Sequence, residues 1–382
     1  MTKGGKLEGW QVEKLGDVCE VFADGDWIES KDQSPEGVRL IQTGNVGNGV
    51  FKDRGKKARY ISEATFKRLR CTEIFEGDCL VSRLPDPVGR ACILPDSGEK
   101  MITAVDCTII RFDKKKVIPK FFNYYSQSDQ YVNDVDHETS GTTRKRISRS
   151  KLAEIEIPIP PLPEQQRIVH MLDEAFAAVA QAKSNAERNL VNARELFDSV
   201  LQSIQAEKKP LGNLVEIKTG KLNANAAVED GEYPFFTCSR EIYAIDKYAF
   251  DCEAILLAGN NASGDFNVKY YKGKFNAYQR TYVITVNEKN QVLYKWLYYQ
   301  LLNSLKEFKK QSVGANTKFL KLGMIQNMQI LLPPLAEQRA IVEQLESLSA
   351  ETGRLEEIYQ LKVRGMEELK KSLLQRAFAG EL

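Results

Sequence analysis

The sequence contains two proline-rich segments that match one another and lead into long charged stretches. The first segment covers residues 157–169 and the second covers residues 330–342, so matching positions lie 173 residues apart. The match continues without a gap, because Glu195 pairs with Glu368 at the same offset. An internal repeat of this length predicts that the chain contains two equivalent structural devices.

Each segment marks the start of a long helix. Proline fixes φ and lacks an amide hydrogen, so it stands before a helix or in its first turn. Glu164 and Glu337 then place a carboxylate in the first turn, where the helix dipole favours negative charge. Apolar residues recur downstream at steps of four and three, which is the spacing of a coiled coil. We therefore expect long helices within residues 158–209 and 331–382, each about 45 residues and ~65–70 Å long.

The order of the segments predicts how the two helices pair. Residues 211–216 resemble residues 15–20, which indicates that a globular domain precedes each helix. A narrow apolar seam must be covered, and the nearest partner for each helix is the other one. Because the second domain follows the far end of the first helix, the second helix must run back antiparallel to the first. The alternative, two core helices of one globular fold, is less favoured because core helices carry a wider apolar stripe.

The globular domains, residues 1–157 and 210–330, combine strand and helix patterns. Runs with strand character alternate with turns at residues 38–42, 78–82, 90–94 and 107–112, and at 233–237, 254–258, 266–271 and 281–285. One helix is expected in each domain, over residues 114–132 and 290–308. The expected fold class is therefore mixed α/β or α+β, with two domains separated by an antiparallel pair of coiled-coil helices and pseudo-two-fold symmetry between the halves.

The residues that enzymes use are scarce in this chain. With two histidines in the whole sequence, no Ser-His-Asp triad or histidine-based metal site can be assembled in either domain. No glycine-rich phosphate loop has the required spacing. Seven cysteines include no C-x-x-C pair, which indicates reduced thiols rather than a zinc or disulfide framework. We therefore expect no catalysis, no metal and no cofactor.

Hydropathy and charge limit the partners. The sequence lacks a run of 18 apolar residues, and its first residues contain no apolar signal core, so we expect a cytoplasmic protein without a membrane partner. The net charge of +2 does not by itself indicate a nucleic-acid partner. Any DNA-binding surface must therefore come from local clustering of basic residues.

Two basic, hydroxyl-rich loops provide such clustering, and they stand at equivalent places just before the proline segments. Gly141 aligns with Gly314 and Lys145 aligns with Lys318. Glycine lets the backbone approach a partner, while Thr, Asn, Arg and Lys donate to phosphates and base edges. One such loop would be interpreted as a solvated turn, but two at equivalent positions favour DNA contact. The candidates are Thr142, Thr143, Arg144, Lys145 and Arg146, together with Asn316, Thr317 and Lys318.

Further candidates for DNA contact lie in polar loops and in segments where aromatic and basic residues alternate. Gln42 and Asn45 carry the amide side chains that suit adenine. The remaining candidates in the first domain are Thr43, Lys56, Lys57, Arg83 and Arg90. Those in the second domain are Asn260, Asn261, Ser263, Lys269, Tyr271, Lys274, Tyr278, Gln279 and Arg280.

Taken together, these motifs resemble those of one known family. Each proline segment contains P-P-L-x-E-Q followed by I-V at the head of a long helix. The first domain adds G-D-C-L-V-S-R and V-D-C-T-I-I-R, and the second adds A-G-N-N-A-S-G and K-F-N-A-Y-Q-R-T-Y-V. This pattern resembles the specificity (S) subunit of Type I restriction-modification systems over essentially the whole chain.

The resemblance implies a function and a set of partners. Two target recognition domains would each read one half of a split sequence in double-stranded DNA, and the helices would set the gap. Two methyltransferase (modification) subunits would dock on the chain, and restriction (endonuclease/translocase) subunits would join them. Docking is expected at the helix heads, at Glu164, Gln165, Glu337 and Gln338. The rival interpretations are a stand-alone coiled-coil DNA-binding adaptor and, less favoured, a nuclease or methyltransferase acting alone.

Overall fold

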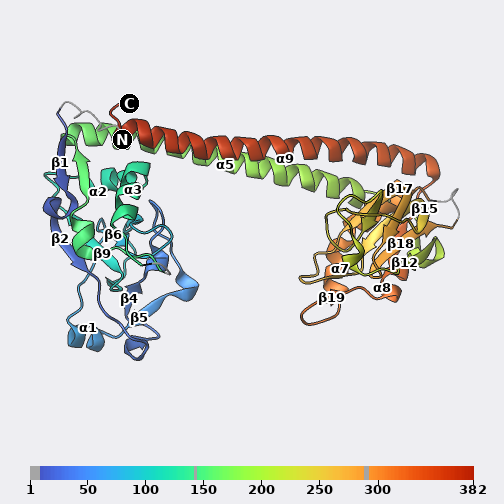
Figure 1. Ribbon diagram of the computed structural model, residues 1–382, viewed down its shortest axis with the longest axis horizontal. Coiled ribbons are helices and arrows are strands. Elements are labelled where there is room, and N and C mark those ends of the chain that lie inside the picture. Colours follow the sequence, from blue (N-terminus) through green and yellow to red (C-terminus); the bar gives the residue numbers. More distant parts are fainter. Residues whose placement is uncertain (1–8, 142–143, 288–291) are drawn as a thin grey trace. The chain divides into compact units, whose positions relative to one another are not determined.

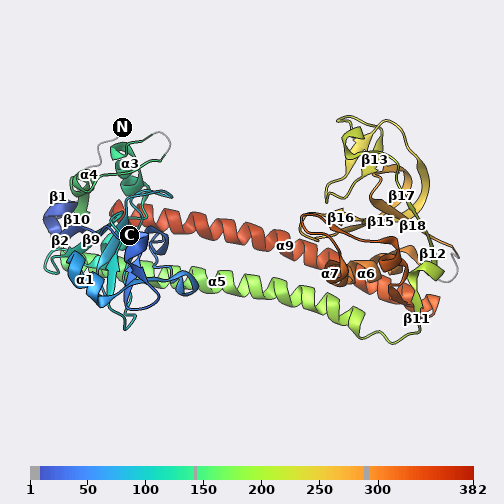
Figure 2. The ribbon, with the colours of Figure 1, turned by 90° about the horizontal axis from the view of Figure 1, so that it is seen from below.

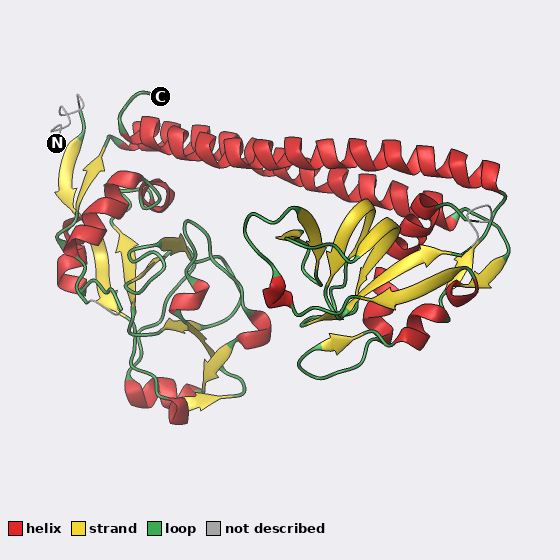
Figure 3. Cartoon of the chain, turned by 45° about the vertical axis from the view of Figure 1, so that its right-hand side comes forward, coloured by secondary structure: helices red, strands yellow, loops and turns green. Residues whose placement is uncertain are grey.

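The computed structural model describes residues 9–141, 144–287 and 292–382. These residues form two compact units, and each unit contains both helices and strands (Figure 3). The first unit combines Met1–Ser184 with Leu361–Leu382, and the second is Asn185–Gln360. No helix among the described residues is both long enough and apolar enough to cross a membrane.

Two long helices, α5 (Leu162–Gln202) and α9 (Leu335–Phe378), have parts in both units (Figure 1). In the first unit, one core holds residues from the start of α5 and the end of α9: Ile168, Leu172, Leu374, Ala377 and Phe378. In the second unit, one core holds residues from the end of α5 and the start of α9: Leu201, Val342 and Leu345. Within each unit, therefore, the start of one helix packs beside the end of the other. This confirms the predicted antiparallel pair.

The proline segments begin as strands, which shortens the first helix relative to our expectation. Strand β1 (Gln11–Lys14) pairs antiparallel with β10 (Glu156–Ile159), and β11 (Lys208–Pro210) pairs antiparallel with β20 (Gln329–Leu331). Residues 158–159 and 208–209 are therefore extended rather than helical. Proline is tolerated in such two-stranded sheets because one side of each strand needs no ladder hydrogen bond.

Two four-stranded sheets build the globular part of the first unit. The first sheet has the order β2 (Cys19–Asp24), β9 (Cys107–Phe112), β6 (Cys79–Ser82), β7 (Ala91–Ile93). The second has the order β3 (Gln33–Ser34), β5 (Arg59–Ile61), β4 (Val38–Ile41), β8 (Met101–Thr103). All four strands that the sequence predicts in this domain are present. Short helices α1 (Glu63–Leu69) and α4 (Arg149–Ala153) complete the unit.

The helix predicted over residues 114–132 is divided in two. Helix α2 covers Pro119–Tyr125 and α3 covers Asp129–Glu138. The division occurs at Ser128, whose hydroxyl accepts a hydrogen bond from the Tyr131 backbone amide at 3.3 Å. A serine N-cap satisfies a free amide at a helix start, so the chain restarts a helix here instead of continuing the old one.

A six-stranded sheet forms the globular part of the second unit (Figure 2). Its order is β12 (Val215–Thr219), β18 (Thr281–Val286), β15 (Phe250–Ala258), β17 (Val268–Ala277), β13 (Tyr233–Phe236), β14 (Tyr243–Ile245). The four predicted strands are all present, and β17 extends beyond the predicted residues 266–271. Strands β16 (Asn260–Asn261) and β19 (Lys318–Phe319) form a separate pair, and α8 covers Leu322–Gln326. The predicted helix 290–308 is divided at Ser304 into α6 (Tyr294–Asn303) and α7 (Leu305–Gln311).

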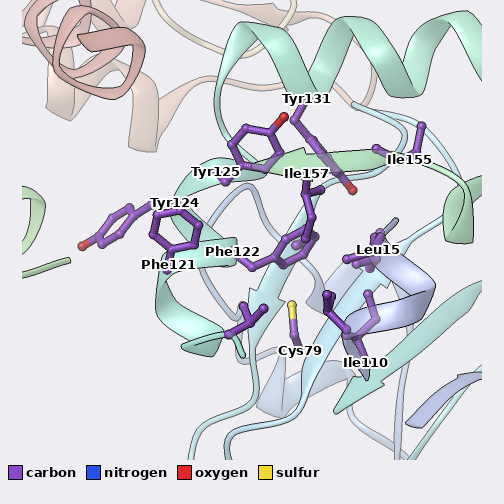
Figure 4. Close-up of a cluster of buried hydrophobic side chains, with 14 of the residues drawn as sticks. Leu15, Cys79, Ile110, Phe121, Phe122, Tyr124, Tyr125, Tyr131, Ile155 and Ile157 are labelled. Atoms are coloured by element: carbon purple, nitrogen blue, oxygen red, sulfur yellow. The ribbon is translucent and has the colours of Figure 1, made fainter. Parts of the chain in front are cut away.

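An aromatic cluster joins the globular part of the first unit to its helix ends. Phe121 and Phe122 of α2 are buried beside Cys79 and Ile110 of the sheet (Figure 4). The Phe378 ring of α9 lies 5.4 Å from the Phe121 ring and 5.1 Å from the Tyr125 ring, measured between centroids. Edge-on aromatic pairs add stabilisation beyond the apolar area they bury. The end of α9 is thus part of the first domain's core.

A buried glutamine fixes the head of each long helix to its domain. The Gln165 side chain has no exposed surface; its amide oxygen accepts from the Ile118 backbone amide at 2.8 Å. Its amide nitrogen donates to the carbonyls of Lys116 and Pro160, both at 2.8 Å. Buried polar groups are tolerated only when they are hydrogen-bonded in this way.

The same arrangement recurs 173 residues later. Gln338 is also fully buried; its amide oxygen accepts from the Leu293 backbone amide at 2.9 Å, and its amide nitrogen donates to the Pro333 carbonyl at 2.8 Å. Gln165 and Gln338, which we expected at a docking surface, are therefore interior residues. The correction follows from burial, because a side chain without exposed surface cannot contact a partner.

We predict that Gln165→Leu and Gln338→Leu each lower the free energy of unfolding by about 2–4 kcal/mol, because each leaves buried backbone groups without partners. Denaturant titration followed by circular dichroism measures the loss. Gln166→Leu is the matched control, since Gln166 is adjacent and exposed. That variant should change the free energy by less than about 0.5 kcal/mol. Equal effects at Gln165 and Gln166 would contradict the buried-clamp interpretation.

Candidate nucleic-acid interface

The two basic loops predicted from the sequence have the same backbone closure. The Ser140 and Arg146 backbones exchange two hydrogen bonds of 2.9 Å, and those of Val313 and Phe319 exchange bonds of 3.2 and 2.8 Å. The two bridges lie 173 residues apart, so the repeat extends into these loops. We call residues 140–146 the first basic loop and residues 313–319 the second basic loop. Thr142 and Thr143 lie outside the described residues.

Both loops need a glycine directly after the first bridge residue. Gly141 has φ 101° and Gly314 has φ 117°, values that L side chains rarely adopt. A β-carbon would also lie 2.6 Å from the Arg144 carbonyl oxygen in the first loop and 2.0 Å from the Thr317 carbonyl oxygen in the second. The alignment of the two glycines in the sequence therefore reflects one turn geometry used twice.

The first basic loop presents exposed cations. Arg144, Lys145 and Arg146 are all exposed. Lys145 pairs with Asp136 at 2.6 Å, and Arg146 pairs with Asp106 at 2.9 Å. Exposed ion pairs contribute ~0–1 kcal/mol, so a phosphate could replace either carboxylate at small cost. The loop is thus suited to bind an anionic backbone.

The second basic loop is joined to the polar loop that follows β15. The pairing of β16 with β19 places Asn260 opposite Phe319 and Asn261 opposite Lys318. Asn316 is exposed, while Thr317 and Lys318 are half-buried. The structure therefore brings together two groups of candidates that are more than 50 residues apart in the sequence.

Side chains of the polar loop shape it and leave one acceptor unused. The Asn261 side-chain oxygen accepts from the Ser263 backbone amide, the Ser263 hydroxyl and the Asp265 backbone amide, at 2.9, 3.0 and 3.0 Å. The Asn260 side-chain oxygen is buried and has no hydrogen-bond partner within the described chain. A buried acceptor without a partner is costly unless a ligand or water supplies the donor.

Residues 278–280 extend this surface. The Arg280 guanidinium lies over the Phe319 ring at 5.2 Å, and the Gln279 side-chain amide donates to Asn223 at 2.8 Å. Gln279 and Arg280 are exposed, and Tyr278 is half-buried. An arginine held over an aromatic ring keeps its donors in a fixed plane, which suits bidentate recognition of base edges or phosphates.

Three other candidates on β17 are less directly placed. The Lys269 ammonium donates to the Ser239 carbonyl and to the Asn267 side chain, the latter at 2.7 Å, and burial lowers the pKa of Lys269. The Tyr271 ring packs on Phe236 at 5.3 Å between centroids. Lys274, which is exposed, lies 4.8 Å from the centroid of the Tyr248 ring. These contacts orient the three side chains toward the domain's own residues.

Arg90, a predicted DNA contact, is instead an internal staple. Its guanidinium is buried and donates to the carbonyls of Val46 at 2.7 Å, Leu84 at 2.6 Å, Pro87 at 3.0 Å and Thr43 at 2.8 Å. These bonds tie the turn after β4 to the loop after β6. The correction arises because the guanidinium's donors are already used by the backbone and its surface is covered.

Asn45 and Arg83 are corrected for the same reason. The Asn45 side chain is buried; it accepts from the Gln42 backbone amide and donates to the Lys52 carbonyl, both at 3.0 Å. Arg83 is 4% exposed; it donates to the Val105 carbonyl at 2.6 Å and pairs with Asp24 at 3.1 Å. Both residues position the loops rather than face a ligand.

The remaining candidates of the first unit are accessible. Gln42 and Thr43 are half-buried in the turn that Arg90 holds in place. Lys56 and Lys57 are exposed on a single helical turn, Gly55–Lys57. These four side chains stay available for phosphate or base contact.

Loops from separate strands meet at one edge of each unit. The first loop edge comprises residues 24–27, 42–45, 82–90, 104–106, 140–141 and 144–149. Backbone hydrogen bonds join its segments: Asp26 to Thr103 at 2.7 Å, Ala104 to Ile41 at 2.9 Å, Arg83 to Asp106 at 2.9 Å and Ile147 to Arg83 at 3.3 Å. Most sequence candidates of the first domain that lie outside residues 52–59 therefore share one surface.

The second unit has the corresponding edge. The second loop edge comprises residues 220–223, 236–240, 258–265, 278–280 and 313–319. Its segments are joined by backbone hydrogen bonds from Tyr278 to Phe236 at 2.9 Å, Gly259 to Arg280 at 2.8 Å and Leu320 to Gly259 at 2.9 Å. The connections match those of the first loop edge segment by segment.

The sequence analysis overlooked residues 237–240 at this edge. They follow β13, just as residues 42–45 follow β4, and β13 and β4 each end in a parallel pairing, with β17 and β8 respectively. Arg240 is exposed and pairs with Asp265 at 2.7 Å. The offset of 196 that relates the two domain starts predicts this correspondence to within one residue, so the signal was present.

The described residues hold no chemistry that competes with binding. No group of three or more His, Cys, Asp or Glu side chains among them could hold a metal ion. Burial raises the pKa of Cys92 to about 12 and that of Cys107 to about 11. The seven cysteines are free thiols, and these two stay protonated at neutral pH, so they are poor nucleophiles.

At the helix heads, two acidic candidates remain accessible. Glu164 pairs with Arg167 at 2.6 Å, and Arg167 also donates to the Leu382 carbonyl at 2.6 Å. Glu337 is exposed. A partner could therefore reach either carboxylate at the surface, in contrast to the buried Gln165 and Gln338.

We predict that Arg90→Lys lowers the free energy of unfolding by about 2–4 kcal/mol, because a lysine cannot donate to four carbonyls at once. Thermal or denaturant unfolding measures the loss. The matched control is Arg59→Lys, since Arg59 is an exposed arginine of the same domain. No difference between the two variants would show that the staple is unimportant.

Comparison with known proteins agrees with this architecture. The model of the family described as the Type I restriction modification DNA specificity domain matches residues 7–188 and 204–361. The chain is 41% identical over 176 residues to the Type I restriction enzyme EcoDI specificity subunit of Escherichia coli, a match that covers 45% of this chain and 37% of that protein. It is 25% identical over 314 residues to the StySPI specificity subunit of Salmonella potsdam, covering 70% of this chain and 66% of that protein.

A solved structure gives the same result for the fold. The chain matches, with a TM-score of 0.75 and 18% identity, one chain of a structure that concerns complex assembly and conformational transition of the type I R-M system. The match covers 98% of this chain and 99% of that one. This likeness confirms the expected fold class, in which two mixed domains are combined with long helices.

Proposed function

This chain belongs to the Type I restriction modification DNA specificity family, and we propose on that basis that it selects the DNA sequence for a Type I restriction-modification complex. The curated relatives that it matches are specificity subunits, although the matches span 37% and 66% of their lengths. Each globular domain, residues 1–157 and 210–330, acts as a target recognition domain for one half of a bipartite target in double-stranded DNA.

The observation that carries this proposal is the repeated loop edge. Both units present a basic loop that is closed by the same bridge, begins with the same strained glycine and contacts an equivalent polar loop. A surface that merely solvated the protein would have no reason to repeat at this level. Two edges with one frame and different side chains suit two different half-sites.

The chemistry of the edges fits duplex DNA. Exposed lysines and arginines supply phosphate contacts, which position the protein, and amide and guanidinium groups such as those of Gln42, Gln279 and Arg280 can read base edges. The polar acceptor of Asn260 is buried without a partner, which suits a donor from a base edge or from a bound water. Sequence selection would thus depend on a few side chains held by the loops.

The partners are proposed from the family and from the helix heads. Two methyltransferase subunits would dock near Glu164 and Glu337, and restriction subunits would join the assembly through them. The chain itself performs no catalysis in this proposal; modification and cleavage belong to the partner subunits. The free chain should therefore bind DNA without altering it.

We predict that the two basic loops serve different halves of the target. Once modified adenines mapped across the host genome define that target, Arg144→Ala with Lys145→Ala should weaken binding roughly tenfold for duplexes that retain the first domain's half. Lys318→Ala should weaken binding only for duplexes that retain the other half. Fluorescence anisotropy of labelled duplexes measures both effects.

The matched control for this experiment is Lys114→Ala. Lys114 is exposed in the same domain but follows the end of β9, whereas the first loop edge adjoins the start of that strand. Its removal should leave the affinity unchanged. Equal losses at both halves from either loop variant would refute the division between the domains.

We also predict that the long helices set the gap between the half-sites. Four residues inserted after Ser184 in α5, together with four before Leu361 in α9, would lengthen each helix by ~6 Å. The accepted gap should then grow by about two base pairs, since base pairs are spaced ~3.4 Å apart. Mapping of modified adenines in cells that carry the altered chain measures the gap.

An unchanged gap in the doubly lengthened chain would show that the helices do not determine it. Insertion into α5 alone provides the comparison. That change displaces one apolar seam against the other and should lower stability instead of producing a new defined gap.

A further inference from the structure

Trp27 is unusually exposed for its residue type. The chain has three tryptophans. The Trp10 ring packs against Phe121, and Trp296 is fully buried with its indole nitrogen donating to the Leu331 carbonyl at 2.8 Å. Trp27, in contrast, is 71% exposed. Leaving an indole in water forfeits the stabilisation that burial of a large apolar side chain provides, so the exposure needs a reason.

Trp27 belongs to the first loop edge. The preceding residue, Asp26, is fixed by a bond from its amide to the Thr103 carbonyl at 2.7 Å, and its carbonyl accepts from the Val105 amide at 3.0 Å. Arg83 donates to the Val105 carbonyl from the other side. Asp24, three residues before Trp27, pairs with Arg83. The indole therefore extends from a backbone that is locked among the DNA-contact candidates.

The equivalent position in the second unit contacts a candidate base-reading residue. There the Leu222 carbonyl accepts from the Gln279 amide at 2.9 Å, as the Asp26 carbonyl does from Val105. The next residue, Asn223, accepts from the Gln279 side chain at 2.8 Å. One frame position thus carries an indole in the first domain and an amide in the second.

The polar edge of the indole is already engaged. Glu29 receives hydrogen bonds from the Lys31 ammonium and from the Trp27 side chain, and both lower the pKa of Glu29. Lys31 and Glu29 lie 2.7 Å apart as an ion pair, which offsets the carboxylate's charge near DNA. With its N–H held by the protein, the indole presents its apolar face outward.

We propose that Trp27 is a DNA contact of the first target recognition domain, with its indole packing against deoxyribose rings and base edges, thymine methyl groups in particular, of that domain's half-site. This inference rests on the proposed function and adds a recognition residue to it. Apolar contact with thymine methyl groups is an established means of base discrimination, and the difference between Trp27 and Asn223 fits domains that read different sequences.

Acrylamide quenching of tryptophan fluorescence tests the contact directly in the full chain, because Trp27 is the exposed indole while Trp10 and Trp296 are shielded. Three labelled duplexes are compared: the bipartite target, and two versions with one or the other half scrambled. Anisotropy of the same samples reports whether each duplex is bound. We expect the target and one half-scrambled duplex, but not the other, to protect the fluorescence from acrylamide.

Substitutions provide the second measurement. Trp27→Ala should weaken binding roughly tenfold for duplexes that retain the first domain's half and should not affect binding through the other half. Trp27→Phe should retain affinity within about threefold, because a phenyl ring keeps the apolar face. Phe75→Ala is the matched control: Phe75 is 49% exposed in the same domain but precedes β6, whereas the loop edge follows that strand.

The outcomes separate this inference from the proposed function. If anisotropy shows sequence-dependent binding while acrylamide quenching stays unchanged, Trp27 is not a DNA contact and the proposed function stands. If methyltransferase subunits without DNA protect the fluorescence, the indole belongs to a protein interface and the inference is overturned. If no duplex binds in a sequence-dependent manner, both the inference and the proposed function fall.

Discussion

The structure depends on how each globular domain is fixed to a helix that could not be stable alone. Gln165 and Gln338 provide this connection, because each buried amide bonds the backbone of its own domain and the carbonyl of a preceding proline residue. The helix head and the segment before α2 or α6 are thereby held in one geometry. Apolar packing, such as that of Phe378 in the first core, adds stabilisation but little direction.

The loop edges follow from that attachment. Strands fixed against the helix heads end in loops whose backbones are bonded to one another, and buried side chains such as Arg90 remove the remaining freedom. The exposed side chains can then differ between the domains without changing the frame. Electrostatics is local in this design: a chain with a net charge of +2 presents cations at the loops, where weak ion pairs with Asp106 and Asp136 can give way to phosphates.

Much of the architecture could be predicted because repetition and periodicity are visible in the sequence. The antiparallel helices and the eight predicted strands are confirmed. The helix breaks at Ser128 and Ser304 could not be predicted from periodicity, since local capping determines them. The strand at Pro158 was missed because proline was interpreted only as a signal that precedes a helix.

The candidate site was harder to predict for a physical reason. Polar residue types indicate what a side chain can bind, but not whether the fold has already used its donors. Arg83, Arg90, Asn45 and Gln165 all suit an external ligand by type, and all are buried among backbone carbonyls and amides. Arg240 and Trp27, by contrast, become candidates only when the two domains are compared position by position. Tertiary contacts therefore decide between a positioning role and a contacting role.

The central claim is that two equivalent edges each hold one half of a divided target. Hydroxyl-radical footprinting of the full chain on a long duplex that contains the target tests it most directly. The account predicts two protected segments with an unprotected stretch between them, and scrambling one half should remove only its own segment. A single continuous footprint, or loss of both segments when one half is scrambled, would contradict the account.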